Sequence, residues 1–340
     1  MKSRERVTRA IEMKGPDRIP ISHTTLAGAF HRHGDTLRHL YEEYPSDCIN
    51  LGATGEGEFS GRAGVESVDA WSSVWVSTTD DYKGAIVEPV LRTWADFDTF
   101  QPPDPIVDPQ DLAHGRHIVE ENAGDKYLVV DGDTLWQRMF YLRGYENIMV
   151  DLAAHRSKAA ALRDMILEFM LERMHIWLEL EIDAFQVRDD WGTQETLMIN
   201  PTLWRAFFKP AYQEICDLVH DAGRHVWFHS DGAIVSIIPD MIEIGVDVIN
   251  PQVPLVGVEM LGREHGGDVC FLGDVDRQQL LPFGTPKEIE CYVKDVIEAL
   301  GAYNGGYIGR GELAPDVPLE NARAMFEAFR EYGEYPQPTR

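Results

Sequence analysis

The sequence predicts an α/β protein that forms a single (β/α)8 barrel. Eight short segments rich in β-branched and aromatic residues recur along the 340 residues, and longer amphipathic segments separate them. The short segments are almost continuously apolar, which is typical of strands covered on both faces of a parallel sheet. This alternation along the whole length favours one barrel over two domains, and a doubly wound sheet is the alternative.

Each expected strand ends in small, polar or acidic residues before a helical pattern begins. The eight segments are Arg18–His23, Asp47–Gly52, Tyr127–Asp131, Asp183–Arg188, Arg224–His229, Val246–Asn250, Asp268–Gly273 and Gly305–Gly309. The amphipathic, charged start of the chain, MKSRERVTRAIEMKG, predicts a helical segment ahead of the first strand.

Three helices have clear signals between the strands. Residues Ser157–Leu180 carry apolar side chains at i, i+3 and i+4 spacing, which predicts one buried stripe. Asn200 followed by Pro201 predicts an N-cap and a first helical residue, opening a helix that runs to about His220. Thr285 and Glu288 form a capping box, which predicts the start of a helix through Leu300.

One stretch interrupts the alternation. Residues 55–109 follow the second expected strand and contain three tryptophans and a cluster of prolines. Long irregular segments in compact domains often serve function, so a β-rich lid over the barrel mouth is one interpretation. A surface excursion is the other, with equal weight. We therefore expect residues 1–340 to form one barrel domain with 55–109 as an insertion.

Composition excludes several classes of function. The chain has 31 basic and 57 acidic residues, a formal charge of −26, so nucleic acids and anionic membranes are poor partners. No run approaches the roughly 20 apolar residues of a membrane span. Four scattered cysteines without a CxxC pair argue against a disulfide framework or a self-contained structural zinc site. We expect a soluble cytoplasmic enzyme, and leave assembly into a homo-oligomer open.

The rim of the expected barrel is unusually polar. Barrel enzymes hold their active sites at the carboxyl ends of the strands. The residues that follow the expected strands are His23, Glu56, Glu58, Asp131, Asp133, Asp189, Asp190, Trp191, Gln194, His229, Asp231, Asn250, Gln252, Asp274, Asp276 and Glu312. A cation would relieve the repulsion among so many carboxylates. Helix capping is the alternative explanation for any one of them.

The best-defined local group is His229-Ser230-Asp231-Gly232, at the end of one expected strand. Residues at i and i+2 can turn into one cavity where the strand breaks at glycine, so His229 and Asp231 could bind one ion. One strand earlier, Asp189 or Asp190 could act as general acid or base. Trp191 beside them would exclude water and raise the pKa of a neighbouring carboxyl group.

Five ordered motifs run through nearly the whole chain: SRERVTRAIEMKGPDRIPI, DDWGTQ, NPTLWRAFFKP, HVWFHSDGAI with IIPDMIEIGVDVINPQ, and APDVPLENARAMFEAF. Together they resemble the uroporphyrinogen decarboxylase superfamily. The resemblance implies a single (β/α)8 barrel and two activities, decarboxylation of porphyrinogen acetates or methyl transfer involving corrinoids. The arginine-rich, substrate-binding segment of the decarboxylases is missing here, and only Arg32 and Arg38 could replace it.

The corrinoid methyltransferases of this superfamily hold zinc with His-x-Cys and a distant Cys. At the corresponding positions this chain has His229-x-Asp231, and Gly311 next to Glu312. The resemblance therefore implies a divalent metal, foremost zinc, held by His229, Asp231 and Glu312. Oxygen ligands in place of thiolates give a harder, more Lewis-acidic ion, which suits oxygen-bearing substrates.

The leading hypothesis is a methyltransferase that moves a methyl group from a small methoxylated donor to a corrinoid carried by a partner protein. Asp189 and Asp190 are its expected catalytic acids. The expected substrate-binding residues are His23, Asp133, Trp191, Gln194, Asn250, Gln252 and Asp274. A decarboxylase of a tetrapyrrole or small organic acid, with Arg188, Arg32 or Arg38 holding the carboxylate, is the first alternative. A non-catalytic corrinoid- or tetrapyrrole-binding protein is the second.

Overall fold

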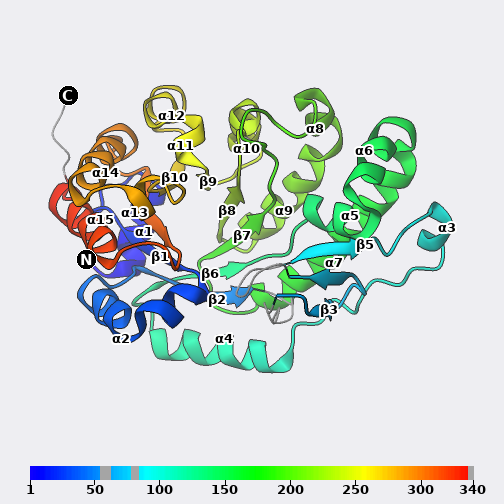
Figure 1. The fold of residues 1–340 in the computed structure, drawn as a ribbon, viewed down its shortest axis with the longest axis horizontal. Helices are drawn as coiled ribbons and strands as arrows, with labels where there is room; N and C mark the ends of the chain where they lie inside the picture. The colour runs from blue at the N-terminus through cyan, green and yellow to red at the C-terminus, as the bar shows by residue number, and fades with distance from the viewer. Residues whose placement is uncertain (54–62, 78–83, 336–340) are drawn as a thin grey trace.

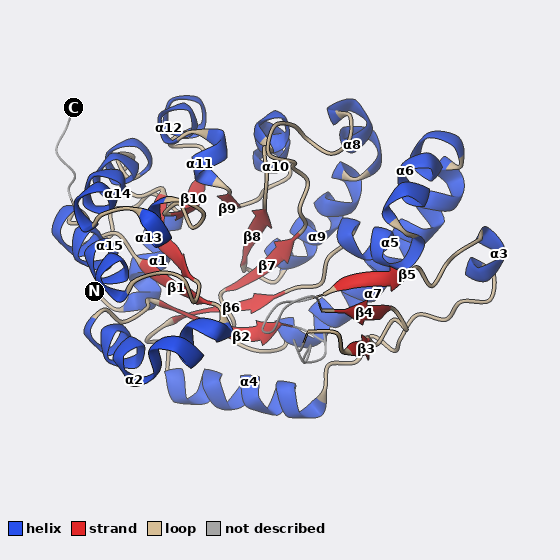
Figure 2. Ribbon diagram, viewed as in Figure 1, coloured by secondary structure: helices blue, strands red, loops and turns tan. Residues whose placement is uncertain are grey.

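The computed structural model describes residues 1–53, 63–77 and 84–335, which form a nearly closed barrel of eight parallel strands surrounded by helices (Figures 1 and 2). The strands follow the order β1-β11-β10-β9-β8-β7-β6-β2 around the barrel. Their bounds are β1 Ile21–Thr25, β2 Cys48–Ala53, β6 Tyr127–Asp131, β7 Ala184–Arg188, β8 His225–Ser230, β9 Val248–Pro251, β10 Cys270–Asp274 and β11 Tyr307–Leu313. The predicted fold class is confirmed.

Every predicted strand segment overlaps an observed strand, and the differences lie at the ends. The prediction for Arg18–His23 starts too early, because Pro20 has no backbone N–H for the parallel ladder and β1 begins at Ile21. The prediction for Gly305–Gly309 stops too early, because β11 continues to Leu313. Glu312 is therefore part of a strand rather than of the loop that follows it.

Helices cover the outside of the barrel between successive strands (Figure 2). The larger ones are α2 Ala27–Glu43, α4 Pro109–Asn122, α5 Trp136–Arg143, α6 Tyr145–Ala154, α7 Arg156–Leu178, α8 Pro201–Phe207, α9 Lys209–Asp221, α10 Ile238–Glu243, α12 Val258–His265, α14 Pro286–Leu300 and α15 Leu319–Tyr332. Short ones are α3 Trp94–Phe97, α11 Val253–Val256, α13 Leu280–Phe283 and the 3-10 turn η1 Val235–Ile237.

Two of the three helix predictions are confirmed, and the third needs a correction. Helix α7 matches the predicted stripe, and α14 begins at the predicted capping box of Thr285 and Glu288. The helix expected from Pro201 to about His220 is two helices, with Phe208 between them. Pro210 stands in the first turn of α9, where its missing N–H costs nothing, and so favours a new helix start there.

Two separate apolar layers follow from the alternation of side chains along the strands. Phe228, for example, packs outward in the large core between strands and helices, whereas Trp227 packs inside the barrel. The inner cluster also contains Val7 and Ile11 of helix α1 Ser3–Ile11, so the predicted N-terminal helix fills the amino end of the barrel. Side chains at the carboxyl end of the barrel are left to form a site.

The insertion packs beside the barrel. It contains the antiparallel sheet of β3 Glu66–Val68, β4 Val74–Val76 and β5 Ala85–Glu88. Trp71 packs edge-on against Phe169 of α7, with ring centroids 4.7 Å apart. Asp69 forms a buried ion pair of 2.8 Å with Arg138 of α5. The idea of a lid stays a prediction, since residues 54–62, with Glu56 and Glu58, and 78–83 lie outside the described residues.

Among the described helices, none combines the length and apolar character needed to cross a bilayer.

All four cysteines are free thiols, as the absence of a disulfide pattern predicts. Burial raises the pKa of the Cys216 thiol to about 12, which suits a small core residue rather than a nucleophile.

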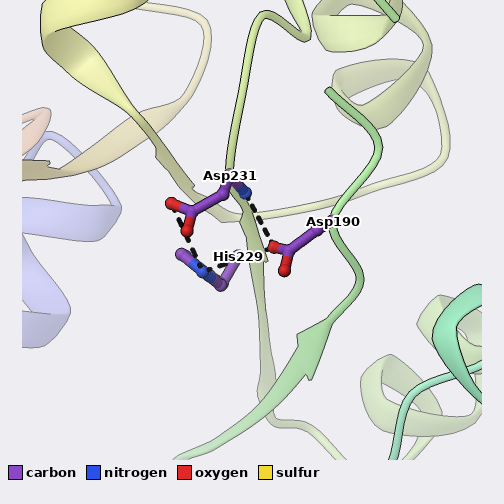
Figure 3. Close-up of side chains that lie close together, drawn as sticks. All are labelled: Asp190, His229 and Asp231. Atoms are coloured by element: carbon purple, nitrogen blue, oxygen red, sulfur yellow. Dashed lines mark hydrogen bonds and ion pairs between the residues drawn. The ribbon is translucent and has the colours of Figure 1, made fainter. Parts of the chain in front are cut away.

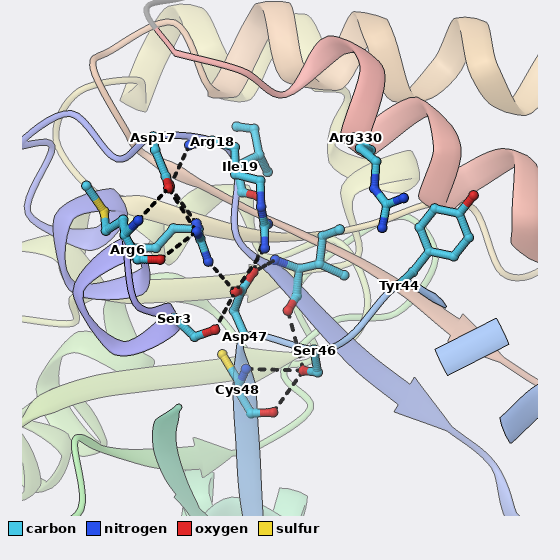
Figure 4. Close-up of polar contacts among 12 residues, drawn as sticks. Ser3, Arg6, Asp17, Arg18, Ile19, Tyr44, Ser46, Asp47, Cys48 and Arg330 are labelled. Atoms are coloured by element: carbon cyan, nitrogen blue, oxygen red, sulfur yellow. Dashed lines mark hydrogen bonds and ion pairs between the residues drawn. The ribbon is translucent and has the colours of Figure 1, made fainter. Parts of the chain in front are cut away.

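A buried carboxylate joins the two strands at the ends of the sheet order (Figure 4). Asp47, only 1% exposed, immediately precedes β2 and accepts hydrogen bonds from Ser3 Oγ at 2.8 Å and Arg6 Nη1 at 2.7 Å. It also accepts from Arg18 Nη1 at 2.9 Å and from the backbone N–H of Ile21 at 2.8 Å. The backbone N–H of Asp47 donates to the Ile21 carbonyl at 2.7 Å. Asp47 thus links α1, β1 and β2 where the barrel closes.

We expect Asp47→Ala to lower the free energy of unfolding by about 3–5 kcal/mol, because it leaves the buried Arg6 guanidinium without its closest buried partner. Urea unfolding of the two proteins measures this difference. Asp35→Ala is the control, since the Asp35–Arg38 pair is exposed and should contribute less than about 1 kcal/mol. Equal effects of the two substitutions would contradict the role of Asp47.

Candidate active site

A polar cavity of about 310 Å³ lies at the carboxyl end of the barrel. Its floor includes Trp227 and Leu272 of the inner apolar cluster. Its polar walls are formed by Ser22, Thr24, Asn50, Gln186, Arg188, His229, Asp231, Asp274, Arg277, Arg310 and Glu312. The position is the one expected for the active site of a barrel enzyme, and the size suits a small molecule.

Three side chains at the mouth of strands β7 and β8 converge on one point (Figure 3). His229 Nε2 lies 3.7 Å from Asp190 Oδ1 and 3.9 Å from Asp231 Oδ1. All three side chains are half-buried, and one donor atom from each lies within 4.8 Å of the others. This geometry could hold a metal ion among one nitrogen and two oxygen ligands.

Two glycines allow the loops after β7 and β8 to meet. A Cβ atom on Gly232, which has φ +83°, would lie 2.2 Å from the backbone of Gly192. Because neither residue carries a side chain, Gly192 N donates to the Asp231 carbonyl at 3.1 Å. The backbone N–H of Asp231 in turn donates to Asp190 Oδ1 at 2.9 Å. The sequences DDWG and HSDG thus bring their acidic residues to one place.

Asp189, one of the two predicted catalytic acids, does not line the cavity. It is fully buried, and its carboxylate accepts hydrogen bonds from the backbone N–H groups of Leu135, Trp136 and Gln137 and from the Tyr212 hydroxyl. Burial raises the pKa of Asp189 to about 7, against the lowering effect of these hydrogen bonds. The side chain anchors the start of α5 and does not join the group of Asp190, His229 and Asp231.

Glu312 lies in the cavity but is held by an arginine. Arg277 Nη1 donates to Glu312 Oε1 at 2.7 Å, and Arg277 Nη2 donates to Asp231 Oδ2 at 2.7 Å. Burial alone would lower the pKa of Arg277, yet these two carboxylates raise it. The carboxylate that joins His229 and Asp231 is Asp190, rather than the Glu312 that we predicted.

Two predicted substrate-binding residues orient the His229 ring from its Nδ1 side, Asn250 directly and Asp274 through Asn250. Its Nδ1 lies 2.7 Å from Asn250 Oδ1, and Asn250 Nδ2 donates to the Leu272 carbonyl at 2.6 Å and to Asp274 Oδ2 at 3.3 Å. Asp274 is paired with Arg310 at 3.0 Å. Asp274 therefore lines the cavity, whereas Asn250 is buried next to His229, and both contact other protein groups.

His23 borders the cavity, but its ring faces the helices. The ring stacks on Tyr41 at 3.9 Å, packs near Phe326 and donates from Nε2 to the Tyr44 carbonyl at 2.7 Å. The alternation along β1 explains this placement, since Ile21 also faces outward and Ser22 between them faces the barrel interior. Burial lowers the pKa of His23 to about 4, so the ring is neutral.

Four other predicted substrate-binding residues lie elsewhere. Asp133 forms an ion pair with Arg173 of α7 at 3.2 Å. Trp191 is fully buried and stacks on Trp136, with centroids 5.0 Å apart. Gln194 is exposed on the loop after β7.

Gln252 is buried and accepts a hydrogen bond from Gly232 N at 3.1 Å, so it supports the loop that carries Asp231. Like the other three, it does not line this cavity. A position just after a strand does not by itself show that a side chain lines the cavity, because loop residues point in several directions.

Six of the polar residues that form the cavity walls were not among the predicted site residues: Ser22, Thr24, Asn50, Gln186, Arg277 and Arg310. Arg188 was named only for the decarboxylase alternative. Along β7, Gln186 and Arg188 alternate with the outward-facing Phe185 and Val187, and in β11 Arg310 lies two residues after the inward-facing Ile308. Strand alternation therefore places these three side chains towards the cavity. Gln186 is 4% exposed, and its side-chain amide has no protein partner among the described residues, so it is available to a ligand. Arg277 lies in a loop, where no sequence pattern marks it.

The fold and its cavity define a (β/α)8-barrel protein with a nitrogen–oxygen site at the carboxyl end. The family model described as uroporphyrinogen decarboxylase (URO-D) matches residues 75–332. The chain belongs to this family, whose superfamily members are enzymes with methyltransferase or decarboxylase activity.

Two curated relatives are uroporphyrinogen decarboxylases. The chain is 27% identical to that of Christiangramia forsetii over 55% of its own length, and the match spans 50% of that relative. It is 25% identical to that of Prochlorococcus marinus over 74% of its length and 72% of the relative. A solved methyltransferase from Methanosarcina mazei is 16% identical, with a TM-score of 0.75 over 98% of this chain and 99% of that one. This last likeness concerns the fold.

The buried neutral ring of His23 predicts a pH dependence of stability. Its pKa is about 4 in the folded chain and about 6.5 in the unfolded chain, so the unfolded state binds more protons between these values. The contribution of His23 is complete above pH 6.5 and is lost as the pH falls towards 4, by at most about 3 kcal/mol.

Urea unfolding at several pH values measures this loss as the difference between wild type and His23→Gln, which keeps an N–H donor for the Tyr44 carbonyl. The exposed His117→Gln is the control and should follow the wild-type profile. If His23→Gln retains the full wild-type loss of stability below pH 6.5, another group is responsible.

Proposed function

We propose that this protein is a metal-assisted methyltransferase that moves a methyl group from a small methoxylated donor to a corrinoid delivered by a partner protein. The observation that carries the proposal is the convergence of His229 Nε2 with Asp190 and Asp231 on one point. Membership of the URO-D family and the fold shared with a methyltransferase support it.

The residues present fit a divalent cation. Imidazole nitrogen and carboxylate oxygen suit zinc and similar ions, and the thiolates that would favour sulfur chemistry are absent from these positions. Five carboxylates and three guanidinium groups surround the cavity, which gives a formal charge of −2 without His229. The carboxylates belong to Asp131, Asp190, Asp231, Asp274 and Glu312. A divalent cation would balance this charge.

When bound, such an ion would act as a Lewis acid that weakens the methyl–oxygen bond of an ether. The protein's own residues supply binding and orientation. Asp231 would hold the ion through Oδ1 while Arg277 holds Oδ2, and Gln137 holds Asp190 through Oδ2 at 3.0 Å. These contacts fix both carboxylates in place.

Gln186 and Arg188 are our proposed substrate-binding residues. Both project from β7 into the cavity, and Arg188 is the neighbour of His229 in the strand register. Asp131 pairs with Arg188 and so fixes its guanidinium. The remaining N–H groups of Arg188 can donate hydrogen bonds to the methoxylated substrate and to its departing oxygen. The cavity volume of about 310 Å³ favours a small donor over a tetrapyrrole.

The charge pattern gives decarboxylation less support. Each arginine that lines the cavity is already paired with a carboxylate, as in Arg188–Asp131, Arg277–Glu312 and Arg310–Asp274. The positive charge that would attract a substrate carboxylate is therefore already balanced at each of these arginines. Carbon dioxide release from a tetrapyrrole or a small acid would support this alternative, and tight corrinoid binding without turnover would support a non-catalytic binding protein.

We expect His229→Ala to lose bound zinc and to lower methyl transfer from 2-methoxyphenol to cob(I)alamin at least 100-fold, because the site loses its one nitrogen ligand. Metal content by mass spectrometry and methylcobalamin absorbance measure the two effects on one preparation. His220→Ala removes a partly exposed histidine paired with Asp247 and should retain both properties. Wild-type activity that survives complete metal removal would contradict the metal role.

Arg277→Gln should strengthen Zn²⁺ binding, in contrast to His229→Ala. The guanidinium lies 2.7 Å from Asp231 and repels a nearby cation, so its removal should tighten Zn²⁺ binding about tenfold. Competition with a chromophoric chelator measures the affinity. Arg205→Gln, which removes a more exposed arginine paired with Asp240, should leave it unchanged. Weaker Zn²⁺ binding in Arg277→Gln would contradict the prediction and show that holding Asp231 in place outweighs the repulsion.

A further inference from the structure

A line of polar side chains crosses four neighbouring strands behind His229. It runs from His229 in β8 to Asn250 in β9, Asp274 in β10 and Arg310 in β11. His229 and Asn250 are register partners, as are Asp274 and Arg310. Asn250 is 1% exposed and Asp274 is 7% exposed, so the contacts along this line are shielded from water.

The neighbours of Asn250 fix which way its amide points. One end lies 2.6 Å from the Leu272 carbonyl and 3.3 Å from Asp274 Oδ2. Both neighbours only accept hydrogen bonds, so this end must be the NH2 group. The amide oxygen therefore faces His229 Nδ1 at 2.7 Å and can only accept. The histidine must supply the hydrogen, which means that Nδ1 carries a proton.

We propose that Asn250 is a positioning residue that holds the proton of neutral His229 on Nδ1. Nε2 then presents its lone pair to the point between Asp190 and Asp231, as a metal ligand requires. Arg310 supports the arrangement by fixing Asp274, which in turn accepts from Asn250. The consequence for the cation rests on the proposed function, whereas the position of the proton does not.

Asparagine is specific for this place because it must accept on one side and donate on the other. Aspartate would still accept from Nδ1–H, but its second oxygen would face the Leu272 carbonyl and Asp274. Leucine would do neither and would leave the tautomer of His229 free to change. The two substitutions therefore separate the hydrogen bond to His229 from the packing of the side chain.

The first test is direct observation of the ring proton in the metal-free protein. Long-range ¹H–¹⁵N NMR spectra, assigned by comparison with His229→Gln, identify the protonated nitrogen at a pH where the ring is neutral. We expect Nδ1–H in wild type and in Asn250→Asp, and a shift towards Nε2–H in Asn250→Leu. Wild type with its proton on Nε2 would overturn the proposal, whatever the variants do.

The second test is Zn²⁺ affinity by chelator competition. Asn250→Leu should bind Zn²⁺ 10- to 100-fold more weakly than wild type. Asn250→Asp should retain more of the affinity than Asn250→Leu. Asn50→Leu is the matched control, because Asn50 lines the cavity but bonds to Asp131 instead of His229. Equal affinity in Asn250→Leu and wild type would overturn the role of Asn250 in the cation site.

The two tests also separate this proposal from the proposed function. If wild type carries the proton on Nδ1 but binds no Zn²⁺, the methyltransferase proposal fails and the role of Asn250 in fixing the tautomer stands. If wild type binds Zn²⁺ with the proton on Nε2 of the metal-free ring, the metal site stands and the role of Asn250 fails.

Discussion

Charge compensation inside the carboxyl end of the barrel is the constraint on which the site depends. The nearly closed parallel sheet directs every second strand side chain inward, and here Asp274 and Glu312 are among those that line the cavity, beside Asp231 in a loop. Like charges in a cavity oppose ionisation unless a counter-charge lies beside them. Arg188, Arg277 and Arg310 each provide a positive counter-charge to one or more carboxylates. Asp190, Asp231 and His229 Nε2 together form a site that a cation would fit.

The arrangement of Asp190, His229 and Asp231 also depends on residues outside this group. Asp189 is adjacent in sequence to Asp190, yet it points the other way and binds three backbone N–H groups at the start of α5. A carboxylate in that position complements the partial positive charge of the helix end. The paired glycines Gly192 and Gly232 then bring the two acidic loops together. Rigid support of this kind is what a preorganised site requires.

Family membership and reaction are separate conclusions here. The URO-D match covers most of the chain, and the barrel it implies is the one observed. The chemistry depends on individual positions, where this chain has carboxylates beside His229 and arginines that are paired with carboxylates. A fold supports many reactions, so the proposed methyl transfer rests on the site rather than on the relatives' names.

The sequence by itself determined the barrel, because strands buried on both faces are continuously apolar and interrupt the helical patterns clearly. It also determined that His229 and Asp231 lie together, since they are two residues apart at a strand end. Only the tertiary structure decided that Asp190 rather than Glu312 joins them.

Tertiary structure also decided that the His23 ring turns to the helices and that Arg277 clamps two carboxylates. These outcomes depend on the exact starting residue of a strand and on the course of loops. A shift of one residue in a strand reverses the side that each residue faces, and loop contacts join positions far apart in the chain.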